Sequence, residues 1–276
     1  MTYLVISDNL YTSLNNCIND LSNVSEIYQT FYNKPEFMFL MNSAKTVLAE
    51  EKYVVLKNTP FCTAEHLEAL ISFFGNFYGR IEHTGIKVDC NYTGCASSKL
   101  TLHNDDAIDL ISQPTLGFIQ VIKEDPLLKV TNGIVVVREL IRKLKFEDPT
   151  LLELLLTNTV PMFSLGVNYE SEDKSYIDVK SPILYKEDGQ YKVRFDYDRI
   201  MFYYQYHNIK QSHEEGQMIY KFLQYCESIK SQVLLNKGDI LIHQNKLTLH
   251  DRTPCSIGID VNQQLFSREI FVSFAL

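Results

Sequence analysis

Histidine and aspartate side chains in two distant segments have the types and spacing of a metal site. His103 and Asp105 stand in the segment LTLHNDDA, and His250 stands far downstream in GDILIHQNKLTLHDRT. Two imidazoles and one carboxylate are the facial triad of non-haem Fe(II) sites, a ligand set that leaves positions open for a cosubstrate and dioxygen. The sequence therefore predicts oxygenase chemistry if these three residues meet.

The local pattern favours the upstream pair. LTLH alternates polar and apolar residues as a half-buried strand does, and residues two apart on a strand face the same side. His103 and Asp105 could then hold one ion while Asn104 points away. The alternative is a histidine at a strand end followed by a turn-forming aspartate, because H-x-D spacing is common.

The surrounding elements follow from periodicity. Residues 1–50 have apolar side chains at helical spacing and are expected to cover a sheet; Thr63 is expected to cap a helix over residues 65–79. Pro149 fits the first turn of another helix, and residues 214–233 form a further helix. Glu187, Asp188 and Gly189 predict a hairpin turn. Because strands dominate the last forty residues without βαβ alternation, we expect one α+β domain over residues 1–276.

Composition limits the function classes. The 276 residues carry a net charge of −8, which argues against nucleic acid as a partner. Six cysteines lack a C-x-x-C pair, and a disulfide between Cys90 and Cys95 is the minority interpretation. No signal peptide or membrane span is evident. We therefore expect a cytoplasmic protein with a small-molecule partner and no membrane attachment, its oligomeric state open.

The histidine segments resemble a known family. Gly238 and Asp239 precede an apolar strand, and Asn245 and His250 match an N-x-x-x-x-H turn. With His103 and Asp105, this arrangement resembles the clavaminate synthase-like and taurine dioxygenase (TauD)-like branch of Fe(II)/2-oxoglutarate oxygenases. The family turn favours His250 over its rival His243 as the distal ligand. The resemblance implies a double-stranded β-helix, a cupin-like jelly roll flanked by helices.

The resemblance also implies positions for the cosubstrate. Arg268, on the expected final strand, matches the family arginine that binds the far carboxylate of 2-oxoglutarate, a task suited to the planar guanidinium. The alternative is a surface arginine paired with Glu269 or solvent. Thr131 fits the threonine that shares this carboxylate, although an ordinary turn threonine has the same signature. Ser98 lies in a segment that resembles the family's serine-containing loop before the metal pair, and we expect it to bind substrate.

Substrate contacts are expected from three more residues. Asp196 and Asp198 lie two apart in VRFDYDRI, which resembles a strand of amino-acid hydroxylases in this branch, so they could share a face and pair with an ammonium or guanidinium group. The alternative is an exposed strand with Arg194 and Arg199 as partners. Arg252 could bind a substrate or cosubstrate carboxylate or form a structural salt bridge.

The implied reaction couples oxidation of 2-oxoglutarate by O2 to hydroxylation of an unactivated C–H bond. Fe(II) and 2-oxoglutarate are the implied cofactor and cosubstrate, and the retained Asp105 favours hydroxylation over halogenation. We expect a free amino acid as the substrate, and the acidic pair suggests a basic one. Oxidative desaturation or cyclisation is the alternative within the family. A non-catalytic β-barrel that binds metal, including zinc, is the alternative outside it.

Overall fold

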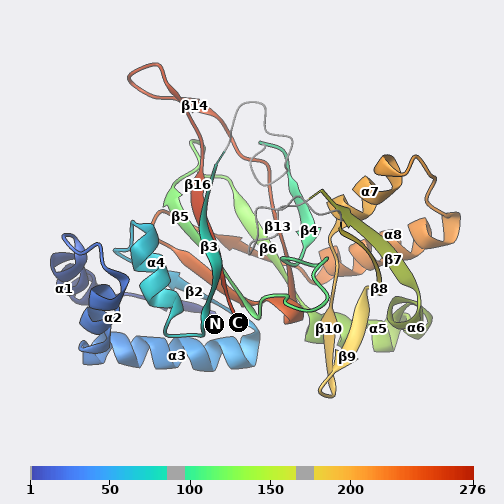
Figure 1. The fold of residues 1–276 in the computed structure, drawn as a ribbon, viewed down its shortest axis with the longest axis horizontal. Coiled ribbons are helices and arrows are strands. Elements are labelled where there is room, and N and C mark those ends of the chain that lie inside the picture. The colour runs from blue at the N-terminus through green and yellow to red at the C-terminus, as the bar shows by residue number, and fades with distance from the viewer. Residues whose placement is uncertain (1, 86–96, 166–176) are drawn as a thin grey trace.

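The computed structural model describes residues 2–85, 97–165 and 177–276. These residues form a mixed helix and sheet structure in which strands lie between two groups of helices, α1–α4 at one side and α5–α8 at the other (Figure 1). Cys90 and Cys95 lie outside the described residues. Within the described part of the chain, no helix has the length and apolar character needed to cross a membrane.

A six-stranded sheet forms one wall of the core. Its strand order is β1-β2-β12-β5-β16-β3, with β1 parallel to β2 and the other pairs antiparallel. The strands are β1 (Tyr3–Val5), β2 (Tyr53–Lys57), β3 (Phe77–Gly85), β5 (Leu116–Lys123), β12 (Ile240–Gln244) and β16 (Glu269–Ala275). Strand β1 interrupts the N-terminal region that the sequence predicted to be helical throughout.

Four N-terminal helices cover the outer face of this sheet. Ser7, Asn23 and Thr63 cap α1, α2 and α4 through their side chains, as their short oxygen-bearing side chains favour. The helices are α1 (Asp8–Ile18), α2 (Val24–Tyr32), α3 (Pro35–Glu51) and α4 (Ala64–Ile71). Their apolar side chains form one cluster with Ile240 and Ile242 of β12. Helix α4 ends well before residue 79, the expected end, because the chain enters β3 there.

A four-stranded antiparallel sheet forms the second wall, with the order β11-β6-β13-β4. Its outer face packs through Leu102, Val135 and Leu249 against helices that include α5, α6 and α8. Pro149 opens α6 as predicted. The strands and helices are β4 (Leu100–His103), β6 (Thr131–Val136), β11 (Ser231–Leu234), β13 (Thr248–Arg252), α5 (Val137–Glu147), α6 (Pro149–Thr157) and α8 (His213–Ile229).

A smaller apolar layer lies between the two sheets. It joins Val55, Ile119 and Leu241 of the larger sheet to Ile134 and Val233 of the smaller one. Because side chains alternate along a strand, the neighbours of these residues face the outer helices. The odd-numbered residues of β12 and the even-numbered residues of β6 and β13 therefore point into the space between the sheets.

The remaining elements are short and peripheral. Asp188 and Gly189 have positive φ values of 51° and 74° and close the predicted hairpin, as a two-residue turn of mirror-image geometry requires. These elements are β7 (Thr159–Ser164), β8 (Ile177–Pro182), β9 (Leu184–Glu187), β10 (Gln190–Val193), α7 (Tyr197–Tyr206), the 3-10 turn η2 (Asn245–Leu247), β14 (Gly258–Ile259) and β15 (Leu265–Phe266).

Candidate metal centre

Strand pairing brings the two distant histidines together. In the antiparallel pair β4–β13, His250 stands directly opposite His103. Residues in that relation project to the same side of the sheet, and the two ring centroids lie 4.2 Å apart. Candidate ligand atoms of His103, Asp105 and His250 all lie within 4.8 Å of one another. The fold thus assembles the predicted ligand set.

Asp105 reaches the histidines by a different route from the expected one. Strand β4 ends at His103, and Asp105 lies in the turn that follows. Its Oδ1 atom is 3.8 Å from Nε2 of His103 and 3.8 Å from Nε2 of His250. The expectation of a shared strand face was wrong, because the turn, and not strand alternation, directs the carboxylate back toward His103.

Asn245 fixes the backbone of this turn. Its side-chain oxygen accepts from the Asp105 N–H at 2.8 Å, and its amide group donates to the carbonyl groups of Asp105 at 2.8 Å and Pro114 at 3.1 Å. Gln113 donates to the same Asp105 carbonyl at 3.0 Å. Asn245 is fully buried. It therefore connects the turn carrying the carboxylate to the segment carrying the distal histidine.

Asn104 fixes the turn from its other side. Its backbone N–H donates to the Phe195 carbonyl at 2.9 Å, and its side-chain oxygen accepts from the Phe195 N–H at 2.8 Å. Its amide also donates to the Val193 carbonyl at 3.3 Å. This fully buried side chain joins the turn that carries Asp105 to the segment before α7. Neither asparagine's contact could be read from the local sequence pattern, since the partners are about 90 and 140 residues away in the chain.

The donor atoms have the protonation that a metal requires. Nδ1 of His103 donates to the Thr101 carbonyl at 2.8 Å, which leaves an electron pair on Nε2 facing Asp105. Burial lowers the pKa of His250 well below its usual value, so this imidazole is neutral. Burial raises the pKa of Asp105 to about 6, against the opposing effect of His103. Two imidazole nitrogens and one carboxylate are donor types that suit Fe(II).

His243 is a third imidazole at the same place. It is fully buried on β12, and its ring centroid lies 4.7 Å from that of His250. Burial lowers the pKa of His243 to about 3. Its Nε2 lies 3.6 Å from Oδ2 of Asp105, and therefore faces the carboxylate oxygen that is not near the other two imidazoles. Within the described residues, the close group of candidate ligands contains His250 and not His243.

Arg268 is a buried cation near the metal group, the name used here for His103, Asp105 and His250. It lies immediately before β16 and is 4 % exposed. Its Nη2 donates to Oδ1 of Asn132 at 3.0 Å, and no ion pair joins it to a carboxylate of the described chain. Burial lowers the pKa of Arg268 to about 10, which still leaves it charged at pH 7. The alternative of a surface arginine paired with Glu269 is thus wrong.

The register of β6 and β13 gives the spacing between this cation and the metal group. His250 pairs with Ile134, and Arg252 pairs with Asn132, the partner of Arg268. Two residues along a strand advance by about 7 Å. Asn132 is two residues from Ile134, the partner of His250, and it therefore lies about 7 Å further along the strand direction on the same inner face. The sequence pattern does not single out Asn132, because only the pairing of β6 with β13 reveals its neighbour.

Thr131 lies on the opposite face of β6. Its side chain alternates with those of Asn132 and Ile134, and its hydroxyl donates to Oε1 of Gln232 on β11 at 2.9 Å. The structure therefore does not bring the Thr131 hydroxyl to Arg268. The one-residue difference from Asn132 decides the face, because side chains on a strand alternate with a period of two.

Arg252 is buried, and its contacts include backbone carbonyl groups and a thiol. Its guanidinium donates to the carbonyl groups of Thr253 at 3.1 Å and Ser98 at 3.1 Å, and to Sγ of Cys255 at 2.7 Å. Ser98 itself is exposed. Arg252 thus connects the segment before β4 to β13. Ser98 takes part in this contact through its carbonyl group, which is a structural role.

Asp196 and Asp198 do not share a strand face, so that expectation was wrong. The chain turns into α7 at Tyr197, with Asp196 as the N-cap that accepts from the Arg199 N–H at 3.1 Å. Asp196 also pairs with the Arg199 side chain at 3.1 Å, the alternative partner anticipated from the sequence. Asp198 lies in the first turn of the helix. The preference of aspartate for N-cap positions outweighed the strand-like pattern. Asp196 still forms an isolated backbone bridge with His103.

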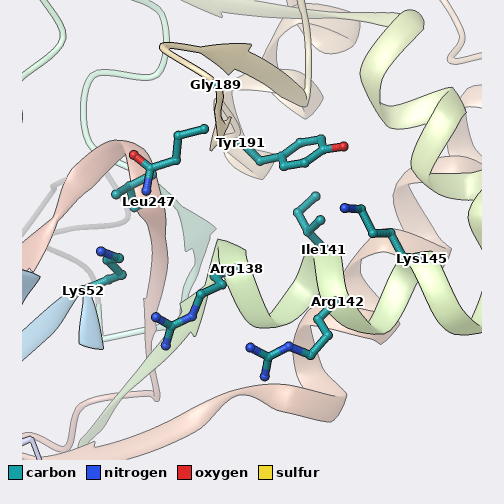
Figure 2. Close-up of a pocket in the computed structure, with 9 residues that line it drawn as sticks. Lys52, Arg138, Ile141, Arg142, Lys145, Gly189, Tyr191 and Leu247 are labelled. Carbon is teal, nitrogen blue, oxygen red and sulfur yellow. The ribbon is translucent and has the colours of Figure 1, made fainter. Parts of the chain in front are cut away.

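A separate cavity of about 370 Å3 lies beside α5 and the β9–β10 hairpin. Figure 2 shows four of the residues that line it, Arg138, Arg142 and Lys145 from α5 and Tyr191 from the hairpin. Arg138 and Arg142 both pair with Glu139. None of the three candidate metal ligands lines this cavity, so it is distinct from the metal centre.

Solved structures share the fold over the whole chain. An asparagine oxygenase in complex with Fe(II), 2S,3S-3-hydroxyasparagine and succinate has a TM-score of 0.73 at 12 % identity, covering 100 % of this chain and 94 % of that one. The non-haem iron oxygenase OrfP in complex with Fe, succinate and (3S)-hydroxy-L-Arg has a TM-score of 0.72 at 11 % identity, with 100 % and 94 % covered.

A taurine dioxygenase from Burkholderia xenovorans has a TM-score of 0.59 at 12 % identity, covering 88 % of this chain and 82 % of that one. No protein-family model and no curated protein matches the sequence. The chain therefore has the fold of the TauD-like and clavaminate synthase-like oxygenases.

Proposed function

We propose that this chain, which has the fold of iron- and 2-oxoglutarate-dependent oxygenases, hydroxylates an unactivated C–H bond of a free amino acid. The observation that carries the proposal is the buried Arg268 guanidinium, which has no anionic partner in the described chain and binds Asn132 one strand step from His250. A buried cation is costly unless an anion compensates it. The far carboxylate of 2-oxoglutarate meets that need.

The proposed roles follow the geometry. His103, Asp105 and His250 would hold Fe(II), and Arg268 with Asn132 would hold the far carboxylate of 2-oxoglutarate. With O2, the bound iron and cosubstrate supply the oxidising power for hydroxylation. Asp105 keeps the carboxylate ligand in place, which favours hydroxylation over halogenation. The proposed core is a double-stranded β-helix, supported by two sheets that share the apolar layer of Val55, Leu241 and Ile134.

A free amino acid is the proposed substrate class. The asparagine oxygenase and OrfP structures contain hydroxylated asparagine and arginine. Here the α7 N-terminus adjoins the metal group through the bridge between Asp196 and His103. Asp198 in the first turn of α7 is a candidate for the substrate's cationic group, whereas Asp196 already pairs with Arg199.

Binding of Fe(II) and 2-oxoglutarate tests the proposal directly. Anaerobic addition of both to the wild type should produce a visible metal-to-ligand charge-transfer band, and His103→Ala should abolish it. A screen of free amino acids should then identify one that stimulates succinate formation, with a product heavier by one oxygen. A folded wild type without the band would contradict the cofactor assignment. A product lighter by two hydrogens would replace hydroxylation with desaturation or cyclisation.

A further inference from the structure

We propose that His243 is a positioning residue whose Nε2–H binds Oδ2 of Asp105, so that the carboxylate offers only Oδ1 to the metal. The inference rests on the proposed function, because it concerns the same metal centre. It assigns a role to an imidazole that the three-ligand set does not use.

The fold confines the His243 ring against Asp105. His243 pairs with Gly117 of β5 across the six-stranded sheet, and it is fully buried. A Cβ atom at position 117 would lie 2.3 Å from Nε2 of His243. Only glycine leaves room for the ring there, so the nitrogen has little freedom to turn away from the carboxylate.

The two carboxylate oxygens of Asp105 face different partners. Oδ1 lies 3.8 Å from Nε2 of both His103 and His250, whereas Oδ2 lies 3.6 Å from Nε2 of His243. That nitrogen is buried and has no hydrogen-bond partner among the described residues. A movement of about half an ångström would bring it within hydrogen-bond distance of Oδ2. A buried polar atom without a partner is costly, and Oδ2 is the acceptor it faces.

Thr248 is compatible with both tautomers of His243. Its hydroxyl oxygen lies 3.0 Å from Nδ1 of His243 and 3.0 Å from the Gln244 carbonyl oxygen. When the single hydroxyl proton is donated to the Gln244 carbonyl, Nδ1 of His243 carries a proton and donates to Oγ1. When the hydroxyl instead donates to Nδ1, the ring's proton resides on Nε2 and points at Asp105. The opposite tautomer would place the lone pair of Nε2 against an ionised carboxylate. The anionic Asp105 that a metal needs therefore favours Nε2–H.

The consequence concerns the number of open metal positions. A carboxylate held through Oδ2 binds with one oxygen, and the remaining positions stay available to a cosubstrate and O2. Groups that hydrogen-bond to metal ligands typically change metal affinity or activity by 10–100-fold when removed. If His243 instead bound the metal itself, it would occupy one of those positions.

Nitrogen NMR of the Zn(II)-loaded protein tests the tautomer. With 15N-labelled histidine, we expect Nε2 of His243 to carry a proton, and Nε2 of His103 and His250 to show metal-bound shifts. The His243→Phe spectrum assigns the signal by its loss. A metal-bound or unprotonated Nε2 on His243 would overturn the inference.

Metal titration of variants tests the effect. His243→Phe should lower Zn(II) and Fe(II) affinity about 10- to 100-fold, and His243→Gln, whose amide can donate to Oδ2, should recover most of it. His66→Phe is the matched control, because His66 is also buried but faces the Ile18 carbonyl. We expect it to lower the melting temperature without changing metal affinity.

The outcomes separate the inference from the proposed function. If the wild type binds no metal, the proposed function fails and the inference fails with it. If the wild type binds metal and His243→Phe binds it equally well, the inference alone fails. An equal loss in His66→Phe would likewise overturn it, since general packing would then explain the effect. Circular dichroism of the metal-free variants checks that each is folded.

Discussion

Arg268 is the residue at which burial and charge conflict most clearly. It is 4 % exposed and donates to a neutral amide, Asn132. Asp105 is the opposite case, a carboxylate whose burial raises its pKa to about 6. Both charges lack full compensation from described neighbours, which is typical of side chains arranged for ligands and not for stability.

Replacing Arg268 by lysine should weaken 2-oxoglutarate binding by about 10-fold or more, because lysine cannot form the two parallel hydrogen bonds of a guanidinium. Titration of 2-oxoglutarate into the anaerobic Fe(II) protein measures this. Arg138→Lys is the control, since Arg138 pairs with Glu139 beside the separate cavity. Unchanged affinity in Arg268→Lys would contradict the cosubstrate role.

The metal centre depends on a turn between elements as much as on the strands. Strand β4 ends at His103, and the following residues are fixed by Asn104 to the Phe195 segment and by Asn245 to the segment before β13. Three segments thus converge on Asp105. The two buried asparagines make these connections, and each uses its side-chain amide as both donor and acceptor.

Asn245→Ala should lower the free energy of unfolding by about 2–4 kcal/mol, because three hydrogen bonds are lost and buried backbone groups lose partners. Urea denaturation measures the loss, and metal titration should show weaker binding as the Asp105 turn loosens. Asn262→Ala, at an exposed position, should change neither quantity. A stable Asn245→Ala protein with full metal affinity would refute the role of the amide.

A buried ion pair connects α8 with the strand of the distal histidine. Lys230 and Asp251 lie 2.8 Å apart with side chains only 5 % and 4 % exposed, and Asp251 also accepts from the Gly133 N–H at 3.0 Å. Lys230→Met should lower the free energy of unfolding by about 3–5 kcal/mol, since it leaves the buried Asp251 carboxylate without its main partner.

The surface pair Lys143–Glu147 provides the comparison for this prediction. Its side chains are 30 % and 44 % exposed, so Lys143→Met should cost no more than about 0.5 kcal/mol. Thermal or urea denaturation of both variants measures the difference. Equal effects would mean that burial does not set the strength of the Lys230–Asp251 pair.

At the scale of the whole molecule, the core has three apolar layers. The N-terminal helices pack on one sheet, α5, α6 and α8 pack on the other, and a smaller layer joins the sheets. His103 and His250 lie on inward-facing positions of the second sheet, and the turn after β4 brings Asp105 to them, so the ligand charges are placed where water is scarce. That location makes the stability of the metal-free protein depend on pH.

Burial raises the pKa of Asp106 to about 7, with Asp105 adding to the effect, whereas its ordinary value is 3.8. The folded metal-free protein therefore retains this proton more strongly than the unfolded chain. The protonated Asp106 side chain therefore stabilises the folded state fully below about pH 4, and this contribution is lost as the pH rises through about 7.

Asp106→Asn should thus match the wild type at pH 4 and exceed its stability by at least about 1 kcal/mol at pH 8. Urea denaturation with a chelator present measures this. Asn also tolerates the positive φ of 48° at this position. Asp188→Asn, in an exposed turn with φ of 51°, is the matched control for replacing an aspartate at positive φ. A pH-independent Asp106→Asn effect would contradict the raised pKa.

The sequence by itself determined several of the elements and the ligand types. Helix caps at Thr63 and Pro149, the turn at Asp188 and Gly189, and the strands near His103 and His250 follow from local spacing and backbone preferences. The choice of His103, Asp105 and His250 also came from residue type and order. These features are local, or depend on a pattern that can be read along the chain.

The tertiary structure decided which faces and partners those residues have. It selected Asn132 over Thr131, placed Asp105 in a turn, and brought His243 against that carboxylate. Each outcome depends on strand register or on contacts across about 90 to 140 residues of chain. A shift of one residue in register reverses a side chain's face, and no local pattern specifies which distant strand will lie opposite.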